Sequence, residues 1–343
     1  MADDSGIGPC MPHERGWILD GPAAQRLHDK SALGRPLPGN TLLLSDSEVL
    51  FCSRHRHLSL DEGWLEERVS QRASLLQETA ALEAMRVPGE KIVMVDNLHH
   101  LSKSVIHSEG TWALRWSRSS IVRSDPPLSE VIWVRDDEPI DWLSLHRWAS
   151  EVSDLERISE VLIVDDEMGV TCYRIDVCDP RGNLNNIDDK PLDEHLDSLL
   201  EDNWSGGLLI PDSELPEQIG SPIPEGTWVD EDEVRLLAGD DDERGAASLL
   251  RDVLGRGLLP RTGFKFGTRW RLYDSPIGED HARWLLQPEW LAPRDWAQAC
   301  LSARLATGVN KTWLCGFEHD GSWLYLGLVR PPADARWSGI RHS

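Results

Sequence analysis

The sequence predicts an α+β protein made of two tandem copies of one unit. Each copy holds a small N-terminal α/β subdomain and then a C-terminal subdomain with a mixed sheet. Three observations support this prediction. The chain has 343 residues, more than a typical single domain. Two distant stretches repeat each other in the same order. Near residue 255, helical spacing of apolar residues gives way to two-residue alternation, which is typical of a helix that leads into a strand.

The front parts of the two copies share a turn rich in proline. Residues 34–38 read Gly-Arg-Pro-Leu-Pro and align with residues 220–224, which read Gly-Ser-Pro-Ile-Pro. In each copy the prolines stiffen a turn that leads into a short strand. A polar residue then caps the free amide groups at the start of a helix, Ser45 in the first copy and Asp230 in the second.

The middle of the first copy is expected to be mainly helical. Leucines and valines recur at helical spacing among charged residues over residues 58–82, which predicts an amphipathic surface helix. Short apolar runs at 92–95 and 112–116 then predict two strands. The corresponding middle part of the second copy is shorter.

The rear parts of the copies repeat as well. Residues 142–175 and 296–329 each predict a helix, a strand, a tight turn and a second strand. A glycine lies in each turn, Gly169 or Gly321, and each helix follows a Pro-x-Asp-Trp sequence. The turn-rich, acidic residues between the copies read as a linker.

These patterns divide the chain into seven parts. They are a tail (1–14), the first α/β subdomain (15–90), the first mixed-sheet subdomain (91–177), a linker (178–203), the second α/β subdomain (204–245), the second mixed-sheet subdomain (246–332) and a tail (333–343).

The composition indicates a globular protein with an acidic surface. The net charge is −24, from 59 acidic and 35 basic residues. No apolar run is long enough to span a bilayer, and the first sixteen residues lack the apolar core of a secretory signal. The six cysteines show no zinc-finger spacing, so we expect reduced thiols, a cytoplasmic location, no membrane association and no metal site.

One stretch opposes this acidic charge. Residues 251–273 combine the end of a helix, a turn and an alternating apolar run, with one acidic residue, Asp252. The same stretch carries six cations: Arg251, Arg256, Arg261, Lys265, Arg269 and Arg271. Such a density of positive charge within an acidic chain calls for an explanation.

The run RGLLPRTGFKFGTRWRLY, which ends at Tyr273, is followed by His281 and then by Lys311 within ARLATGVNKTW. These motifs resemble the catalytic domain of archaeal tRNA-splicing endonucleases. The resemblance is strong over roughly the last hundred residues. It implies a nuclease-like fold for residues 246–332 and intron excision from precursor tRNA at bulge–helix–bulge junctions, without a metal or cofactor. The implied products carry a 2′,3′-cyclic phosphate and a 5′-hydroxyl.

The resemblance also implies a role for each residue. Attack of a ribose 2′-hydroxyl on the adjacent phosphorus needs a base, an acid and a cation near the phosphate. By resemblance these are Tyr273, His281 and Lys311, in that order. A free tyrosine has a pKa of about 10, so we expect nearby cations such as Lys265 to lower the pKa of Tyr273.

Further contacts follow from the same resemblance. Arg304 matches an arginine that holds a flipped-out base of the RNA, and Arg330 is the best candidate for a second one. Lys265 is a third expected RNA contact. The acidic turn Asp165-Asp166-Glu167 matches a loop that locks the inactive unit of one subunit into the active unit of another, which implies a homodimer.

The first copy lacks this chemistry in the sequence alignment. Aligning the two copies on their turn glycines sets Ser159 opposite Lys311. Aligning Trp284 on Trp133 sets Glu130 opposite His281 and Val122 opposite Tyr273. The first copy is therefore expected to keep the fold without an active site.

Two other functions stay open. The chain could be a non-catalytic RNA-binding or structural subunit with a degenerate site. A metal-dependent nuclease is the second alternative, suggested by acidic pairs in IDDK at 187–190 and at Asp165-Asp166.

Overall fold

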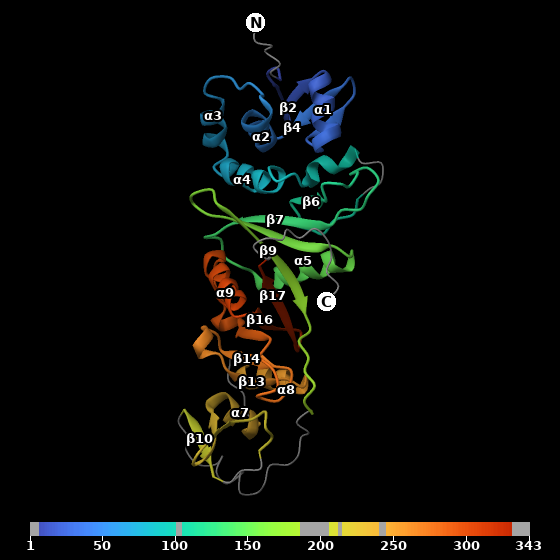
Figure 1. The fold of residues 1–343 in the computed structure, drawn as a ribbon. Coiled ribbons are helices and arrows are strands. Elements are labelled where there is room, and N and C mark those ends of the chain that lie inside the picture. The colour runs from blue at the N-terminus through green and yellow to red at the C-terminus, as the bar shows by residue number, and fades with distance from the viewer. Residues whose placement is uncertain (1–6, 101–104, 186–205, 212–214, 240–244, 331–343) are drawn as a thin grey trace.

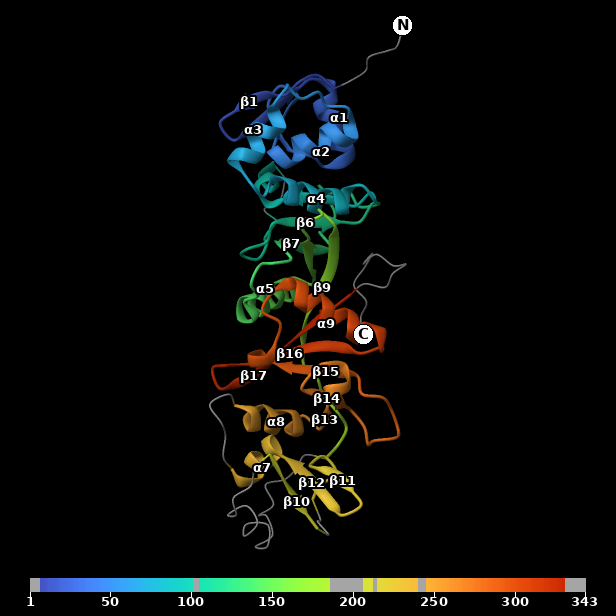
Figure 2. The same ribbon diagram turned by 90° about the vertical axis from the view of Figure 1, so that its left-hand side faces the viewer.

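The computed structural model describes residues 7–100, 105–185, 206–211, 215–239 and 245–330. A small sheet with helices lies at each end of the molecule, and a large sheet lies between them (Figures 1 and 2). The α+β class is confirmed. No helix among the described residues is long and apolar enough to cross a membrane.

The N-terminal sheet is antiparallel with the order β1-β2-β4-β3. Its strands and the helices around it are β1 (Met11–His13), β2 (Gly16–Asp20), α1 (Pro22–Ser31), β3 (Arg35–Leu37), β4 (Thr41–Leu44), α2 (Asp46–Arg56), α3 (Trp64–Gln71) and α4 (Leu75–Arg86). The single helix predicted over 58–82 is in fact two helices, α3 and α4, because the chain turns at residues 72–74.

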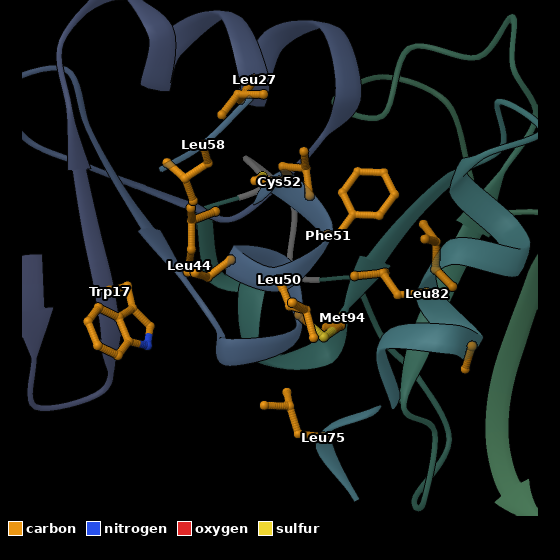
Figure 3. Close-up of a cluster of buried hydrophobic side chains, with 14 of the residues drawn as sticks. Trp17, Leu27, Leu44, Leu50, Phe51, Cys52, Leu58, Leu75, Leu82 and Met94 are labelled. Atoms are coloured by element: carbon orange, nitrogen blue, oxygen red, sulfur yellow. The ribbon is translucent and has the colours of Figure 1, made fainter. Parts of the chain in front are cut away.

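A buried apolar cluster joins this subdomain to the large sheet. Phe51 on α2 and Leu82 on α4 are fully buried, and Met94 from the edge of the large sheet packs in the same cluster. Figure 3 shows these side chains with Leu44 and Leu75 around α2. Burial of this apolar surface is the main force that holds the helices on the sheet.

The second small sheet repeats part of the first one. It has the order β10-β12-β11, and its elements are β10 (Gly207–Ile210), β11 (Ser221–Ile223), β12 (Gly226–Asp230) and α7 (Glu231–Ala238). Helix α8 (Ala246–Gly255) follows and leads to the large sheet.

Both predicted helix caps are confirmed. The Ser45 hydroxyl accepts a hydrogen bond from the amide of Glu48 at 3.2 Å, and the Glu48 carboxylate also accepts one from the amide of Gly34 at 2.8 Å. In the second small sheet Asp230 and Glu233 make the same cap, and Glu233 accepts from the amide of Gly220 at 2.8 Å. The glutamate thus ties each helix start to its proline-rich turn.

The large sheet has ten strands in the order β13-β14-β15-β16-β17-β9-β8-β7-β6-β5. The strands of its first half are β5 (Lys91–Met94), β6 (Ala113–Trp116), β7 (Ser129–Arg135), β8 (Ile158–Val164) and β9 (Val170–Cys178). Those of its second half are β13 (Leu259–Thr262), β14 (Trp270–Tyr273), β15 (Trp284–Pro288), β16 (Thr312–His319) and β17 (Ser322–Val329).

The two halves of the large sheet have the same strand order and directions. In each half one parallel pair, β7 with β8 or β15 with β16, is joined by a helix, α5 (Trp142–Asp154) or α9 (Trp296–Gly308). The other pairs are antiparallel, including β9 with β17 at the centre. Residues from both halves therefore share one apolar core between α5, α9 and the sheet.

Backbone hydrogen bonds fix which residues correspond between the halves. The amide of Lys311 donates to the carbonyl of Ala306 at 2.9 Å, and that of Arg157 donates to Val152 at 3.1 Å. The preceding residues, Asn310 and Glu156, share a left-handed backbone, with φ of 54° and 56°. Arg157 is thus the structural counterpart of Lys311.

The predicted pairing of Lys311 with Ser159 is therefore wrong. The turn between β8 and β9 spans residues 165–169, whereas the turn between β16 and β17 holds only Asp320 and Gly321. Because these turns differ in length, an alignment on their glycines shifts the register of the preceding strands.

Candidate active site

A cleft of about 570 Å³ opens at one end of β14, β15 and β16. Tyr273, His281 and Lys311 all line this cleft. The sheet register brings them together: Leu272 of β14 pairs with Trp284 of β15, which pairs in turn with Thr312 of β16. The ends of these three strands therefore meet, and the predicted residues lie beside them. The remaining lining residues are Lys265, Phe266, Arg271, Ala282, Arg283, Val309 and Asn310.

Lys311 is held at the wall of the cleft. Its ammonium donates a hydrogen bond to the carbonyl of Ala282 and lies 5.8 Å from the centre of the Phe266 ring. Loss of solvent around the ammonium, and then repulsion by Arg271, lowers the pKa of Lys311 from its ordinary value. The sequence places Lys311 there because α9 ends and β16 begins at this point.

Tyr273 and His281 differ in exposure. Tyr273 is only 9% exposed and packs against Leu259 and Ala282. The guanidinium of Arg271 lies 5.5 Å from the centre of the Tyr273 ring. His281 lies in the loop between β14 and β15 and is exposed. The cleft thus presents a phenol, an imidazole and cations to one space.

Residues 248–325 match the family model of the tRNA intron endonuclease catalytic C-terminal domain. That match includes Tyr273, His281 and Lys311. A tRNA-splicing endonuclease of Thermoplasma volcanium is 29% identical over 175 residues, which cover 51% of this chain and 56% of that protein. A tRNA-splicing endonuclease of Methanothermobacter thermautotrophicus is 33% identical over 100 residues, which cover 26% of this chain and 58% of that protein. The chain thus spans a little over half the length of these curated relatives.

Most of the basic stretch at 251–273 serves the fold instead of the cleft. Arg256 pairs with Asp252 and Asp179, and Arg269 pairs with Asp230 and Asp232. The buried Arg261 donates to backbone carbonyls. Only Lys265 and Arg271 of the six cations line the cleft. Arg256, Arg261 and Arg269 are thus neutralised or tied to the backbone, in part by neighbours that the sequence alone does not reveal, and Arg251 is exposed on α8.

The predicted RNA-contacting arginines lie away from the cleft lining. Arg304 on α9 lies near the Tyr173 hydroxyl, which raises the pKa of Arg304 and itself donates a hydrogen bond to the carbonyl of Cys300 at 3.2 Å. Burial raises the pKa of the Cys300 thiol, and the positive charges of Arg304 and Arg330 oppose this with a smaller effect. Both arginines are exposed. Of the three predicted RNA contacts, only Lys265 lines the cleft.

The predicted interface loop forms the turn between β8 and β9. The Asp165 carboxylate accepts hydrogen bonds from the amides of Glu167 at 3.0 Å and Gly169 at 2.7 Å. Asp165, Asp166 and Glu167 are all exposed. Asp165 therefore shapes the turn, and Asp166 and Glu167 extend from it.

In the described residues of the first half, apolar side chains fill the place that corresponds to the cleft. Arg115 of β6 pairs with Ser129 in the same way that Leu272 pairs with Trp284. Trp116 is therefore the counterpart of Tyr273, and Leu114 is the counterpart of Arg271. Trp116 is fully buried and donates to the carbonyl of Asp125 at 2.9 Å. Apolar residues from the loop between β5 and β6 pack over Leu114 and Trp116.

This arrangement corrects two further alignments. Val122 and Glu130 are not the counterparts of Tyr273 and His281. Glu130 lies within β7, where it pairs with Leu114 of β6, whereas His281 precedes β15. The loops between the paired strands differ in length in the two halves, so a residue's distance from a strand in one half does not locate its counterpart in the other.

Among the described residues, no group of three or more His, Cys, Asp or Glu side chains is arranged to hold a metal ion. The acidic run at 187–190, which suggested a metal-dependent nuclease, lies outside the described residues. All six cysteines are free thiols.

Proposed function

We propose that this protein is a tRNA-splicing endonuclease that excises introns from precursor tRNA at bulge–helix–bulge junctions without a metal. The observation that carries the proposal is the convergence of Tyr273, His281 and Lys311 on one cleft within residues 248–325, the part that matches the catalytic domain. An RNA phosphate entering this cleft would meet a proton acceptor, a proton donor and a fixed cation together.

In the proposed reaction Tyr273 accepts the proton of the ribose 2′-hydroxyl. The 2′-oxygen forms a bond to phosphorus while the bond from phosphorus to the 5′-oxygen breaks. His281 donates a proton to that leaving oxygen, because an imidazole can carry a proton near neutral pH. Lys311 stabilises the negative charge on the phosphate oxygens. The products are a 2′,3′-cyclic phosphate and a 5′-hydroxyl.

The proposed chain architecture is a tandem duplication with one active unit. The shared strand order of the two halves and the matching helix caps support this proposal. The first unit has Trp116 and Leu114 where the second has Tyr273 and Arg271, so it would stabilise the fold without cutting RNA.

The proposed assembly is a homodimer in which Asp165, Asp166 and Glu167 of one chain contact the active unit of the other. The exposure of this turn supports the proposal. On α9, Leu301 and Leu305 are 57% and 54% exposed, one helical turn apart, and a second chain would also cover this apolar surface.

Lys265 would hold the RNA backbone at the cleft, and Arg304 and Arg330 would hold an unpaired base beside it. Guanidinium groups stack on bases, and unpaired bases are the part of an RNA that side chains can reach. The exposure of both arginines is compatible with this role.

The test is cleavage of an intron-containing precursor tRNA in excess EDTA, followed by analysis of the fragment ends. We expect Tyr273→Phe and His281→Ala to bind this RNA but cut it at least about a hundredfold more slowly. His319→Ala, which removes a partly exposed histidine at the end of β16, is the control for loss of an imidazole. Normal cutting by both cleft variants would refute the site.

The same experiment separates the alternatives. A non-catalytic RNA-binding subunit would bind the precursor without cutting it, even as the wild-type protein. A metal-dependent nuclease would lose activity in EDTA and regain it with added magnesium.

A further inference from the structure

Arg271 lines the same cleft as Tyr273 and Lys311, the proposed base and the proposed phosphate-binding cation. Arg271 and Tyr273 are alternate residues of β14, so their side chains leave the same face of the strand. The guanidinium lies 5.5 Å from the Tyr273 ring, and its charge acts on Lys311. Two cations therefore face one cleft at a separation short enough for repulsion.

Nothing on the protein side neutralises Arg271 within the described parts of the chain. Its neighbours in sequence, Arg256 and Arg269, each pair with two aspartates, and Arg283 on the same cleft pairs with Asp274 at 3.1 Å. Arg271 has no such ion pair with any acidic residue that the structure describes.

The inner nitrogen of the Arg271 guanidinium is also unsatisfied. Its Nε is buried and has no hydrogen-bond acceptor among the described residues. A buried donor without an acceptor costs about 1–3 kcal/mol. This buried nitrogen does not itself meet a ligand. The guanidinium lines the cleft beside Lys311 without an ion pair among the described residues, and that arrangement indicates a site completed by an anion from outside the chain.

The first half of the sheet provides an internal comparison. Leu114 stands at the position of Arg271, and it packs with Trp116 in an apolar cluster. Of the positions of Tyr273, Arg271 and Lys311, only that of Lys311 holds a cation in the first half. This cation is Arg157, which pairs with Glu130 at 2.7 Å. The arginine and the tyrosine are therefore replaced together, which indicates that Arg271 serves the cleft and is not needed by this strand as such.

We propose that Arg271 binds the scissile phosphate together with Lys311 and stabilises the charge that develops on its oxygens during cleavage. This inference rests on the proposed function. A guanidinium offers two parallel donors to a phosphate, whereas the ammonium of Lys311 acts as a point charge fixed by Ala282. The phosphate would also screen the repulsion between the two cations.

The test compares Arg271→Ala, Arg271→Leu and Arg271→Lys in the full-length protein. We expect Arg271→Ala and Arg271→Leu to lower the single-turnover cleavage rate about 10²–10³-fold, the range seen on loss of one donor to a developing oxyanion. Binding of a precursor with a 2′-deoxyribose at the cleavage site should weaken much less. The cleavage rate of Arg271→Lys should lie between that of the wild type and that of Arg271→Ala, because lysine keeps the charge and loses the paired donors.

Added guanidinium chloride at low millimolar concentration supplies a readout that a structural role would not give. It should restore part of the activity of Arg271→Ala, which leaves space in the cleft, and none of the activity of Arg271→Leu, which fills that space. Arg251→Ala, which removes an exposed cation of the same stretch from α8, should cut like the wild type.

Wild-type rates for folded Arg271→Leu and Arg271→Lys would overturn the inference. So would an Arg271→Ala defect that guanidinium does not restore while Arg271→Lys cuts normally. If the Arg271 variants cut normally but Tyr273→Phe and His281→Ala do not, only this inference fails. If Tyr273→Phe and His281→Ala also cut normally, the proposed function of the cleft fails.

Discussion

Arg157 and Lys311 occupy equivalent backbone positions in the two halves of the large sheet, but their side chains have different partners. Lys311 lines the cleft and donates to the carbonyl of Ala282, whereas Arg157 donates to the Glu130 carboxylate at 2.7 Å. Glu130 is fully buried, and this ion pair lies away from solvent. One fold position thus carries a cation that lines the cleft in one half and an internal ion pair in the other.

Removal of Arg157 should therefore destabilise the fold without affecting the chemistry of cleavage. Arg157→Ala leaves the buried Glu130 with the Ser108 amide and the Thr111 hydroxyl as its donors among the described residues. We expect a loss of about 3–5 kcal/mol in the free energy of unfolding, measured by urea denaturation. Arg135→Ala, which breaks an exposed ion pair, is the control. An equal, small effect of both variants would contradict this account.

A second buried ion pair can be exchanged for the apolar residues of the other half. Arg115 donates to both Glu160 oxygens at 2.7 Å, and Leu272 and Leu314 stand at the equivalent positions. Glu160→Leu alone should cost about 3–5 kcal/mol, because it leaves a buried guanidinium without its main partner. The Arg115→Leu/Glu160→Leu double variant should recover most of that loss.

Urea unfolding of both single variants and the double variant gives the coupling energy directly. Glu90, which also pairs with Arg115, keeps Arg118 as a partner in the double variant. If the loss of stability in the double variant equals the sum of the losses in the two single variants, the ion pair between Arg115 and Glu160 does not stabilise the fold.

Replacement of Lys311 by arginine should change how cleavage depends on pH. Burial and the nearby Arg271 lower the pKa of Lys311 below its ordinary value of 10.5. The charged ammonium, present below the pKa, is therefore lost earlier than in an exposed lysine as pH rises. Lys311→Arg keeps its charge, so the descending alkaline limb of the rate profile should move to higher pH.

Single-turnover rates between about pH 6 and pH 10 test this expectation. Arg271→Leu should lower the overall rate and also move this limb to higher pH, because it removes the repulsion that lowers the pKa of Lys311. An alkaline limb that stays in place in Lys311→Arg would show that another group sets it.

The acidic turn offers a test of the proposed homodimer. Asp166→Asn/Glu167→Gln removes two exposed charges and leaves the Asp165 hydrogen bonds that shape the turn. We expect a larger monomer fraction by light scattering, with an unfolding midpoint near that of the wild type. The wild-type protein should also dissociate more as salt increases, because the proposed contact is ionic. A wild-type protein that is monomeric at all concentrations would refute the homodimer.

Local sequence signals predicted the parts of the fold that depend on neighbouring residues. The caps at Ser45 and Asp230 follow from a polar residue with a glutamate three positions later, and both formed as predicted. Helical spacing located α5 and α9 in the same way. The alternating apolar residues predict a strand that begins at Phe264, but residues 264–266 form a short 3-10 turn after β13. The glycines on both sides allow the chain to turn there, and the apolar alternation did not reveal this.

The site was predictable as a set of residues but not as an arrangement. The order of Tyr273, His281 and Lys311 marked them as a group because it resembles a known catalytic domain. Arg271 was one of six similar cations in sequence. It differs from Arg256 and Arg269 because these two pair with aspartates, which include Asp179 and residues 230 and 232 from distant segments.

The sequence by itself determined the class of the fold, the positions of most helices and strands, and the three residues that face the cleft, because these depend on local spacing and on motif order. Only the tertiary structure decided which residue of one half corresponds to which residue of the other, and which cations remain available to a ligand. Register depends on hydrogen bonds between strands whose connecting loops differ in length. The availability of a charge depends on partners that folding brings from far along the chain.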